Sequence, residues 1–475
     1  MFIVDEAHRS TFGEMLLTIK DTFPNAIFFG FTGTPIYEEN QKKGNTTATV
    51  FGDCLHRYSI ADGIRDKNVL GFDPYMVSTY KPKELRQQVA LEKAKARTVE
   101  EVYSNSDKAK VYDFYMNDDN VKMAGFYDTE GKHVKGIEDY VPSSQYATDE
   151  HKRMVVEDIC SNFPTLSKYG KFHAIFATSS IPEAIGYYRL IKQTKPELKV
   201  TSLFDPHIDN MGGVKYKEDG LVEIIVDYNK RYDQDFTIPT YATFKKDVAL
   251  RLAHKEQYRG IEKTPDKQID LLIVVDQMLT GFDSKWINTL YMDKMLAYAD
   301  VIQAFSRTNR LFGEDKPFGT IRYYRKPYTM RKMIEEAVRL YSGNKPIGLF
   351  VEKLGYNIKK INGFFEDISE LFKRAGITDF VRLPDEYEVK AKFASLFKSM
   401  NNHLEASKIQ GLKWNKLVYV IEEDGEKVTY ELLLTEEIFE VLLMRYKELR
   451  DDNEKIDGGR LPGELPYDLD GYLVE

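Results

Sequence analysis

A length of 475 residues predicts about three domains, and an apolar content of 42% is enough to give each a packed core. The formal net charge of −8 argues against a broadly basic nucleic-acid-binding protein but leaves room for a local basic channel. Only two cysteines, Cys54 and Cys160, are present, which excludes a disulfide framework and favours a cytoplasmic protein. No apolar run reaches the roughly 18 residues that span a bilayer, so no membrane segment is expected.

The first predicted strand runs directly into two adjacent carboxylates. Phe2, Ile3 and Val4 are followed by Asp5-Glu6-Ala7-His8. A short apolar run is typical of a buried parallel strand, and ligands bind past the carboxyl ends of such strands. Two carboxylates there can divide the work, one holding a hydrated Mg²⁺ and the other orienting a water. An isolated acidic pair, however, is usually just a solvated strand end.

A second apolar run, 28–31, ends at the small polar turn Thr32-Gly33-Thr34. Further along, residues 84–103 combine good helix formers with alternating charges, and periodicity then fades over 117–144. We therefore interpret 81–145 as an insertion or linker.

Strands and helices alternate from about residue 149, which predicts a mostly parallel α/β sheet. One strand ends at Ser179 and Ser180, where a helix is expected to begin. A nearly continuous buried strand, 269–275, ends at Thr280-Gly281-Phe282-Asp283, where glycine permits close approach of the backbone to a ligand.

A helix is predicted over 299–311, and it places Gln303, Arg307 and Arg310 on one face because they are spaced i, i+4 and i+7. Two guanidiniums on one stripe can neutralise the charge that develops during phosphoryl transfer. An isolated pair of this kind is more often a solvated basic face.

The last part of the chain is predicted to be mainly helical, with a small hairpin possible near 417–430. Pro384-Asp385 followed by Glu388-Val389-Lys390 is similar to a nuclease pattern. A metal nuclease needs those acids on neighbouring strands, whereas here they fall at a predicted helix start. We therefore interpret this segment as structural.

A phosphate-binding loop with Gly-Lys followed by Ser or Thr does not occur in the sequence. Gly131-Lys132 is followed by His133, and Gly170-Lys171 is followed by Phe172. Because this loop supplies most of the contacts to the β- and γ-phosphates, we expect these 475 residues alone to be inactive as an ATPase.

Taken in order, the segments at 5–8, 32–34, 280–283 and 303–310 resemble motifs II, III, V and VI of superfamily 2 helicases and translocases. Thr178-Ser179-Ser180 is a looser match to motif IV, and Ser306 stands where motif VI usually has glycine. The combination is most similar to the R (motor) subunit of type I restriction enzymes. Two further segments add to the resemblance: Ala61-Asp62-Gly63-Ile64 and Pro466-Tyr467-Asp468-Leu469-Asp470.

The resemblance implies an α/β fold of two RecA-like parallel-sheet motor domains, the first truncated, followed by a mainly α-helical domain. We expect them at 1–145, 146–328 and 329–475. ATP and Mg²⁺ would bind between the motor domains, with His8 contacting Gln303 across the cleft and both arginines facing the Asp5-Glu6 turn. The implied catalytic residues are Asp5 (also the Mg²⁺ ligand), Glu6, Arg307 and Arg310. The implied nucleotide-binding residues are His8, Thr32, Gly33, Thr34, Gly281, Asp283 and Gln303, and the implied DNA-binding residues are Ser179, Ser180 and Thr280.

The implied function is ATP-dependent translocation of duplex DNA, leading to cleavage by a nuclease domain that precedes the motor in the family. The implied partners are duplex DNA and the modification and specificity subunits. Two alternatives stay open: a stand-alone superfamily 2 DNA or RNA helicase, and a non-catalytic scaffold whose helical part docks partner subunits. DNA-stimulated ATP hydrolysis would separate them.

Overall fold

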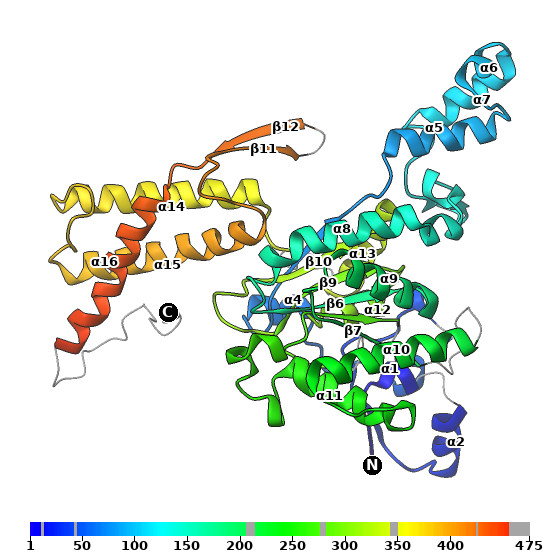
Figure 1. Cartoon of the computed structure of the whole chain (residues 1–475), viewed down its shortest axis with the longest axis horizontal. Helices are drawn as coiled ribbons and strands as arrows, with labels where there is room; N and C mark the ends of the chain where they lie inside the picture. The colour runs from blue at the N-terminus through cyan, green and yellow to red at the C-terminus, as the bar shows by residue number, and fades with distance from the viewer. Residues whose placement is uncertain are drawn as a thin grey trace. The chain divides into compact units, whose positions relative to one another are not determined.

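The computed structural model describes residues 1–10, 14–41, 45–205, 214–275, 282–342, 350–423 and 426–455 (Figure 1). The chain divides into two compact units, Met1–Arg310 with Gly319–Phe350, and Leu311–Phe318 with Val351–Glu475. The expected boundary at 328/329 stays a prediction. Helix α13 (Pro327–Tyr341) belongs to the first unit because its apolar face packs against α12 (Ala299–Phe305). No helix in the described ranges is long and apolar enough to cross a membrane.

A six-stranded sheet forms the centre of the first unit, and all its strand pairs are parallel. Its order is β3 (Phe72–Met76), β10 (Gly319–Tyr323), β9 (Ile287–Asp293), β6 (His173–Thr178), β8 (Leu271–Val274) and β7 (Val200–Leu203). Every residue of β6, β8 and β9 is buried, as expected for strands covered on both faces. The predicted parallel sheet is confirmed.

The edge strand β3 joins the six-stranded sheet although it precedes the insertion. It falls within the range expected for the first motor domain, 1–145, and it pairs with β10 in register from Gly319↔Phe72 to Tyr323↔Met76. Phe72 is fully buried and packs edge-on against Phe305, so burial of this ring favours pairing with the larger sheet. The segment 81–145 therefore follows a strand of the second sheet.

Helices connect the strands of the six-stranded sheet. They are α8 (Asp149–Leu166), α9 (Ile181–Thr194), α10 (Val214–Tyr232), α11 (Tyr241–Ala253) and α12, and α13 follows the last strand, β10. Helix α9 begins where predicted, because the Ser180 hydroxyl accepts a hydrogen bond from the Glu183 N–H. Short 3-10 turns occur at Glu38–Asn40, Ile137–Tyr140, Ser143–Ala147, Ile238–Thr240, Glu256–Tyr258, Ile261–Lys263 and Pro265–Lys267.

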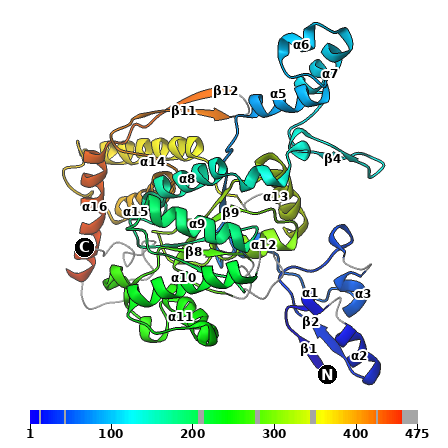
Figure 2. The ribbon, with the colours of Figure 1, turned by 45° about the vertical axis from the view of Figure 1, so that its right-hand side comes forward.

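The N-terminal part contains a separate two-stranded parallel sheet, β1 (Phe2–Val4) and β2 (Phe28–Gly30). It is accompanied by α1 (Ala7–Ser10), α2 (Glu14–Thr22), α3 (Thr47–Phe51) and α4 (Ile60–Arg65), and Figure 2 shows β1, β2, α2 and α3 grouped together. A Cβ at Gly30 would lie 2.9 Å from the Phe51 ring and 3.0 Å from the Ala7 Cβ, so glycine allows β2, α1 and α3 to pack closely.

The insertion forms a small helical module. It comprises α5 (Pro82–Lys93), α6 (Val99–Tyr103), α7 (Ser106–Met116), β4 (Phe126–Tyr127) and β5 (His133–Val134), and Figure 2 shows α5, α6 and α7 close together. Ala90, Val102 and Tyr112 form its own buried cluster. The buried Glu138 carboxylate accepts hydrogen bonds from the N–H groups of Tyr328 (3.0 Å) and Thr329 (2.7 Å), so it holds the insertion to the start of α13.

The second unit is mainly helical, as predicted, and includes a hairpin. Its elements are α14 (Leu354–Arg374), α15 (Tyr387–Ile409), β11 (Val418–Glu423), β12 (Glu426–Glu431) and α16 (Glu436–Lys455). Helices α14 and α15 run side by side around buried residues such as Ile361, Phe393 and Phe397 (Figure 1). The nuclease-like pattern does not lie on neighbouring strands, because Asp385 pairs with Arg382 and Glu388 starts α15.

A buried ionic network fixes the carboxyl ends of β6 and β9. The Asp293 carboxylate accepts hydrogen bonds from Tyr187 (2.7 Å), His151 (3.1 Å) and Arg325 (3.1 and 3.2 Å), and Arg325 also reaches Glu183 at 3.0 Å. Burial alone would raise the pKa of Asp293, but the bonds from His151 and Arg325 outweigh it and hold the pKa below its usual value.

Asp293→Ala should lower the free energy of unfolding of the first unit by about 3–5 kcal/mol, because it leaves Arg325 buried without its main counter-charge. Trp286 reports on this unit in urea titrations once the other tryptophan is removed by Trp414→Phe. The matched control is Glu335→Ala, which breaks the exposed Arg331–Glu335 pair and should cost at most about 0.5 kcal/mol. Equal effects of the two substitutions would contradict the prediction.

Candidate functional site

The two N-terminal strands end side by side and present both polar turns at one edge. The Phe31 N–H donates to the Val4 carbonyl (2.8 Å), and the Ala7 N–H donates to the Phe31 carbonyl (2.9 Å). Asp5 and Glu6 are exposed, and the Glu6 N–H donates to Asp5 Oδ1 at 2.9 Å. Glu6 has a φ of 49°, an uncommon left-handed conformation for a non-glycine residue. The carboxylates thus lie on a sharp turn next to Thr32.

His8 connects the two turns. Its side chain is 9% exposed, and Nδ1 lies 2.8 Å from Thr32 Oγ1 and 3.3 Å from Glu6 Oε2. The Thr34 N–H also donates to Thr32 Oγ1, at 3.1 Å. The predicted site residues on these two turns are therefore brought together, whereas nothing lies within 4 Å of a Cβ built on Gly33.

Gln303, on α12, links these turns to the six-stranded sheet. Its amide nitrogen donates to Thr34 Oγ1 at 2.8 Å and lies 3.0 Å from His8 Nε2. Because an amide N–H₂ only donates, His8 Nε2 accepts and the ring proton resides on Nδ1, facing Thr32 and Glu6. The predicted contact between His8 and Gln303 is confirmed.

The predicted helix over 299–311 is too long, since α12 ends at Phe305. The Ser306 hydroxyl donates back to the Ile302 carbonyl (2.7 Å), and the Thr308 hydroxyl donates to the Phe305 carbonyl (2.9 Å). These local bonds satisfy the last carbonyls and end the helix. Arg307 and Arg310 therefore do not share a helical face with Gln303, although Arg307 Nε donates to the Gln303 carbonyl at 3.2 Å.

Arg310 differs from the expectation that both arginines face the Asp5-Glu6 turn. Its Nε lies 2.6 Å from Asp283 Oδ1, so it pairs with a carboxylate of the same α/β domain. The side chains of Arg310 and Asp283 are 43% and 61% exposed. The structure thus brings together two predicted site residues from motifs V and VI, but as partners of one another.

The structure does not test the three predicted DNA-binding residues, Thr280, Ser179 and Ser180. Thr280, with Gly281 beside it, lies outside the described residues. The Ser179 hydroxyl donates to the Asp293 carbonyl at 2.9 Å, and the buried Ser180 hydroxyl caps α9. Both serines thus have structural roles, and their contact with DNA stays a prediction.

One residue beside the site was missed from the sequence. The Tyr341 hydroxyl, at the end of α13, donates to the Pro35 carbonyl (3.1 Å) and accepts from Asn40 Nδ2 (2.8 Å). It therefore holds the segment that follows Thr34. Tyr341 fits the apolar spacing of its helix, and that pattern predicts a core residue and gives no indication of a polar contact.

Three family models match the chain in order. Residues 1–109 match the SWI2/SNF2 ATPase model, residues 170–326 match type I restriction enzyme subunit R domain 3, and residues 349–470 match the C-terminal model of the R subunit of type I restriction and modification enzymes.

Proteins that are similar to this chain over most of its length are also subunits of type I restriction enzymes. The endonuclease subunit of a type I restriction enzyme from Staphylococcus aureus (strain MRSA252) is 36% identical over 351 residues, covering 72% of this chain and 32% of that protein. A counterpart from Staphylococcus saprophyticus is 34% identical over 352 residues, with the same coverage. The chain thus spans 32% of the length of these relatives.

A solved structure, an ATP-dependent type ISP restriction-modification enzyme bound to DNA, matches with a TM-score of 0.33 and 12% identity, covering 87% of this chain and 23% of that one. The identification comes from the two R-subunit models and from the staphylococcal relatives. The chain belongs to the family of type I restriction enzyme R subunits.

Proposed function

We propose that this chain is the motor part of a type I restriction enzyme R subunit and acts in ATP-dependent translocation of duplex DNA. DNA cleavage would be the task of a separate nuclease domain. The match of residues 1–109 to an ATPase model supports nucleotide use, and the R-subunit matches on either side of residue 340 support the restriction system. The stand-alone helicase and the scaffold are less well supported, because neither explains both kinds of match.

The bridge from Gln303 to His8 and Thr34 is the observation that carries the proposal. It joins α12 to His8, which follows Asp5 and Glu6, through one hydrogen bond, and to Thr34, on the neighbouring turn, through another. Because His8 contacts both Glu6 and Gln303, a change in the position of Glu6 would be transmitted to α12 through His8. Coupling of this kind is what a motor needs to convert nucleotide state into relative movement of two domains.

ATP with Mg²⁺ is the cofactor that fits the site. Asp5 and Glu6 supply hard oxygen atoms, and both are exposed at the end of a parallel strand. Mg²⁺ retains several waters and takes only one or two carboxylates from the protein, so Asp5 can hold it without a second protein ligand. Asp5 would hold the ion, which neutralises phosphate charge when bound, and Glu6 would orient a water.

Duplex DNA and the modification and specificity subunits are the proposed partners. The match of residues 349–470 to the model for the C-terminal part of R subunits supports assembly into such a complex. DNA-stimulated ATP hydrolysis by the assembled enzyme tests the function as a whole, and its absence would overturn the proposal.

Glu6→Gln, in a chain that also carries the phosphate-binding loop, should abolish ATP hydrolysis and leave ATP binding largely intact. The substitution keeps the size of the side chain but removes the charge that polarises water. Hydrolysis and nucleotide binding would be measured separately, with Glu38→Gln, at an exposed carboxylate outside the site, as the control. Near-normal turnover in Glu6→Gln would exclude Glu6 from this role.

Arg307→Ala and Arg310→Ala, in the same background, should each lower kcat by about 10³-fold, the scale seen when an arginine finger is lost. For Arg310 this requires the guanidinium to leave Asp283 during turnover. Asp283→Ala should then lower kcat far less than Arg310→Ala does. If the two substitutions cause equal losses, and the double substitution adds nothing, the pair is structural.

The 475 residues alone should show no DNA-stimulated ATPase, because they carry no Gly-Lys-Ser/Thr loop. A phosphate-release assay with and without duplex DNA measures this. Robust turnover would imply a phosphate site of another type.

A further inference from the structure

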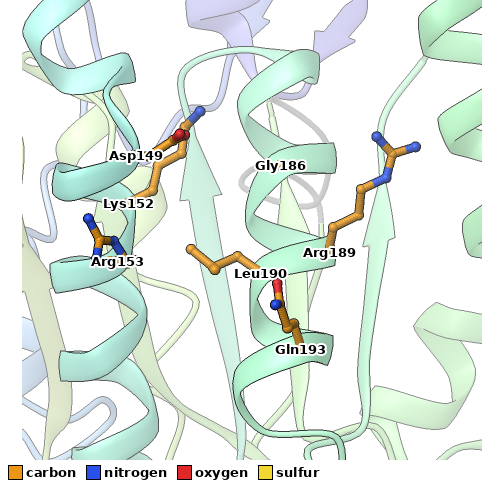
Figure 3. Close-up of a pocket in the computed structure, with 7 residues that line it drawn as sticks. All are labelled: Asp149, Lys152, Arg153, Gly186, Arg189, Leu190 and Gln193. Carbon is orange, nitrogen blue, oxygen red and sulfur yellow. The ribbon is translucent and has the colours of Figure 1, made fainter.

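A groove on the first unit lies between α8 and α9, and its lining residues are different from those of the candidate nucleotide site. Its volume is about 470 Å³, and Figure 3 shows the residues that line it. Lys152 and Arg153 come from the first turns of α8, whereas Gly186, Leu190 and Gln193 come from α9. Cations outnumber the single acidic residue, Asp149.

Two of the cations that line the groove, Lys152 and Arg153, have no carboxylate partner among the described residues. Arg189, in contrast, extends to the other side of α9 in Figure 3 and pairs with Glu223 at 2.6 Å. In a chain with a net charge of −8, two cations that line one groove without a carboxylate partner indicate a site for an anion.

Gly186 shapes the floor of the groove. A Cβ at this position would lie 3.7 Å from the Lys152 Nζ, so the ammonium group faces α9 at Gly186. Glycine inside a helix costs about 1 kcal/mol relative to alanine, and here it leaves the space above the helix open. The Gln193 amide adds a neutral donor further along the same helix.

One end of the groove lies near the carboxyl end of β6, where Ser179 belongs to the segment that resembles motif IV. His151, next to Lys152, bonds to the Asp293 carboxylate, and the Ser179 hydroxyl bonds to the Asp293 carbonyl. The first turn of α8 and the Ser179 loop are therefore held at one end of β9. In parallel α/β sheets this end is where ligands bind.

We propose that this groove binds backbone phosphates of duplex DNA through Lys152 and Arg153, and so extends the DNA track from the Ser179 loop over α8 and α9. The inference rests on the proposed function, in which duplex DNA is the substrate. Phosphate contacts position the protein without reading sequence, which suits an enzyme that moves along DNA. Among the described residues that line the groove, none is an aromatic on which an unpaired base could stack, so a duplex backbone fits better than a single strand.

The test measures binding of the 475-residue chain to a short fluorescein-labelled duplex by anisotropy over a series of NaCl concentrations. Each phosphate contact contributes about 0.9 to the slope of log K against log salt. Lys152→Gln/Arg153→Gln should therefore reduce the magnitude of the slope by about 1.8, so the loss of binding should grow by about 60-fold when the salt concentration falls from 1 M to 0.1 M. Lys245→Gln/Lys246→Gln, the same charge change on α11, should leave the slope unchanged.

Gly186→Glu provides an independent arm, because it places a carboxylate beside Lys152 while improving helix propensity. It should weaken DNA binding without loss of folding, as judged by circular dichroism. Inorganic phosphate at constant ionic strength should not displace the duplex, which separates a DNA track from a site for free phosphate.

Equal losses of DNA affinity in the two glutamine double variants would show a general charge effect and would overturn the proposed role of the groove. An unchanged slope in Lys152→Gln/Arg153→Gln would also overturn DNA binding by the groove. It would favour an acidic protein surface as the partner of the groove and would leave the proposed function of the chain untouched. Failure of the unaltered chain to bind any duplex at low salt would overturn the groove and count against the proposed function as well.

Discussion

The Gln303 amide is the interaction on which the candidate site depends. The carboxylates Asp5 and Glu6 lie at the end of a two-stranded sheet that shares no strand with the six-stranded sheet. Their position relative to α12 is therefore set by side chains, and the amide supplies two such contacts, to His8 and to Thr34. The two partners make the connection specific. Each hydrogen bond contributes only about 0.5–1.5 kcal/mol net, so the connection can break and form again readily. That combination suits a joint between domains that must move.

Helix α13 provides a second and more rigid connection within the same unit. Its first residues are held by the buried Glu138 of the insertion, and its last turn holds the segment after Thr34 through Tyr341. A helix of 15 residues is stiff over its length, so displacement at one end reaches the other. The insertion, which carries its own small core, is thereby tied to the loop beside the candidate nucleotide site.

Much of this arrangement could be predicted because its signals are local. The buried strand β8 is a continuous apolar run, and Ser180 is a recognisable cap. The His8–Gln303 contact is not local, and it was expected from the resemblance of the motifs to a known family. The features that were not predicted leave no mark in the apolar pattern. Periodicity gave no sign that α12 stops at Phe305, because the cause is the hydroxyl groups of Ser306 and Thr308. Likewise, no pattern near Phe72 indicates that β3 joins a sheet whose other strands lie beyond the insertion.

The pairing of Arg310 with Asp283 is best understood through its energy. Both side chains are substantially exposed, and an ion pair of this kind contributes about 0–1 kcal/mol. A bidentate contact between a guanidinium and a phosphate is roughly twice as strong as a neutral hydrogen bond, and it strengthens when water is excluded. Asp283 therefore holds the guanidinium at little cost, and the proposed role of Arg310 in phosphoryl transfer requires this weak pair to open. Arg307 differs, because its Nε is bonded to the Gln303 carbonyl, so its position follows that of the bridge itself.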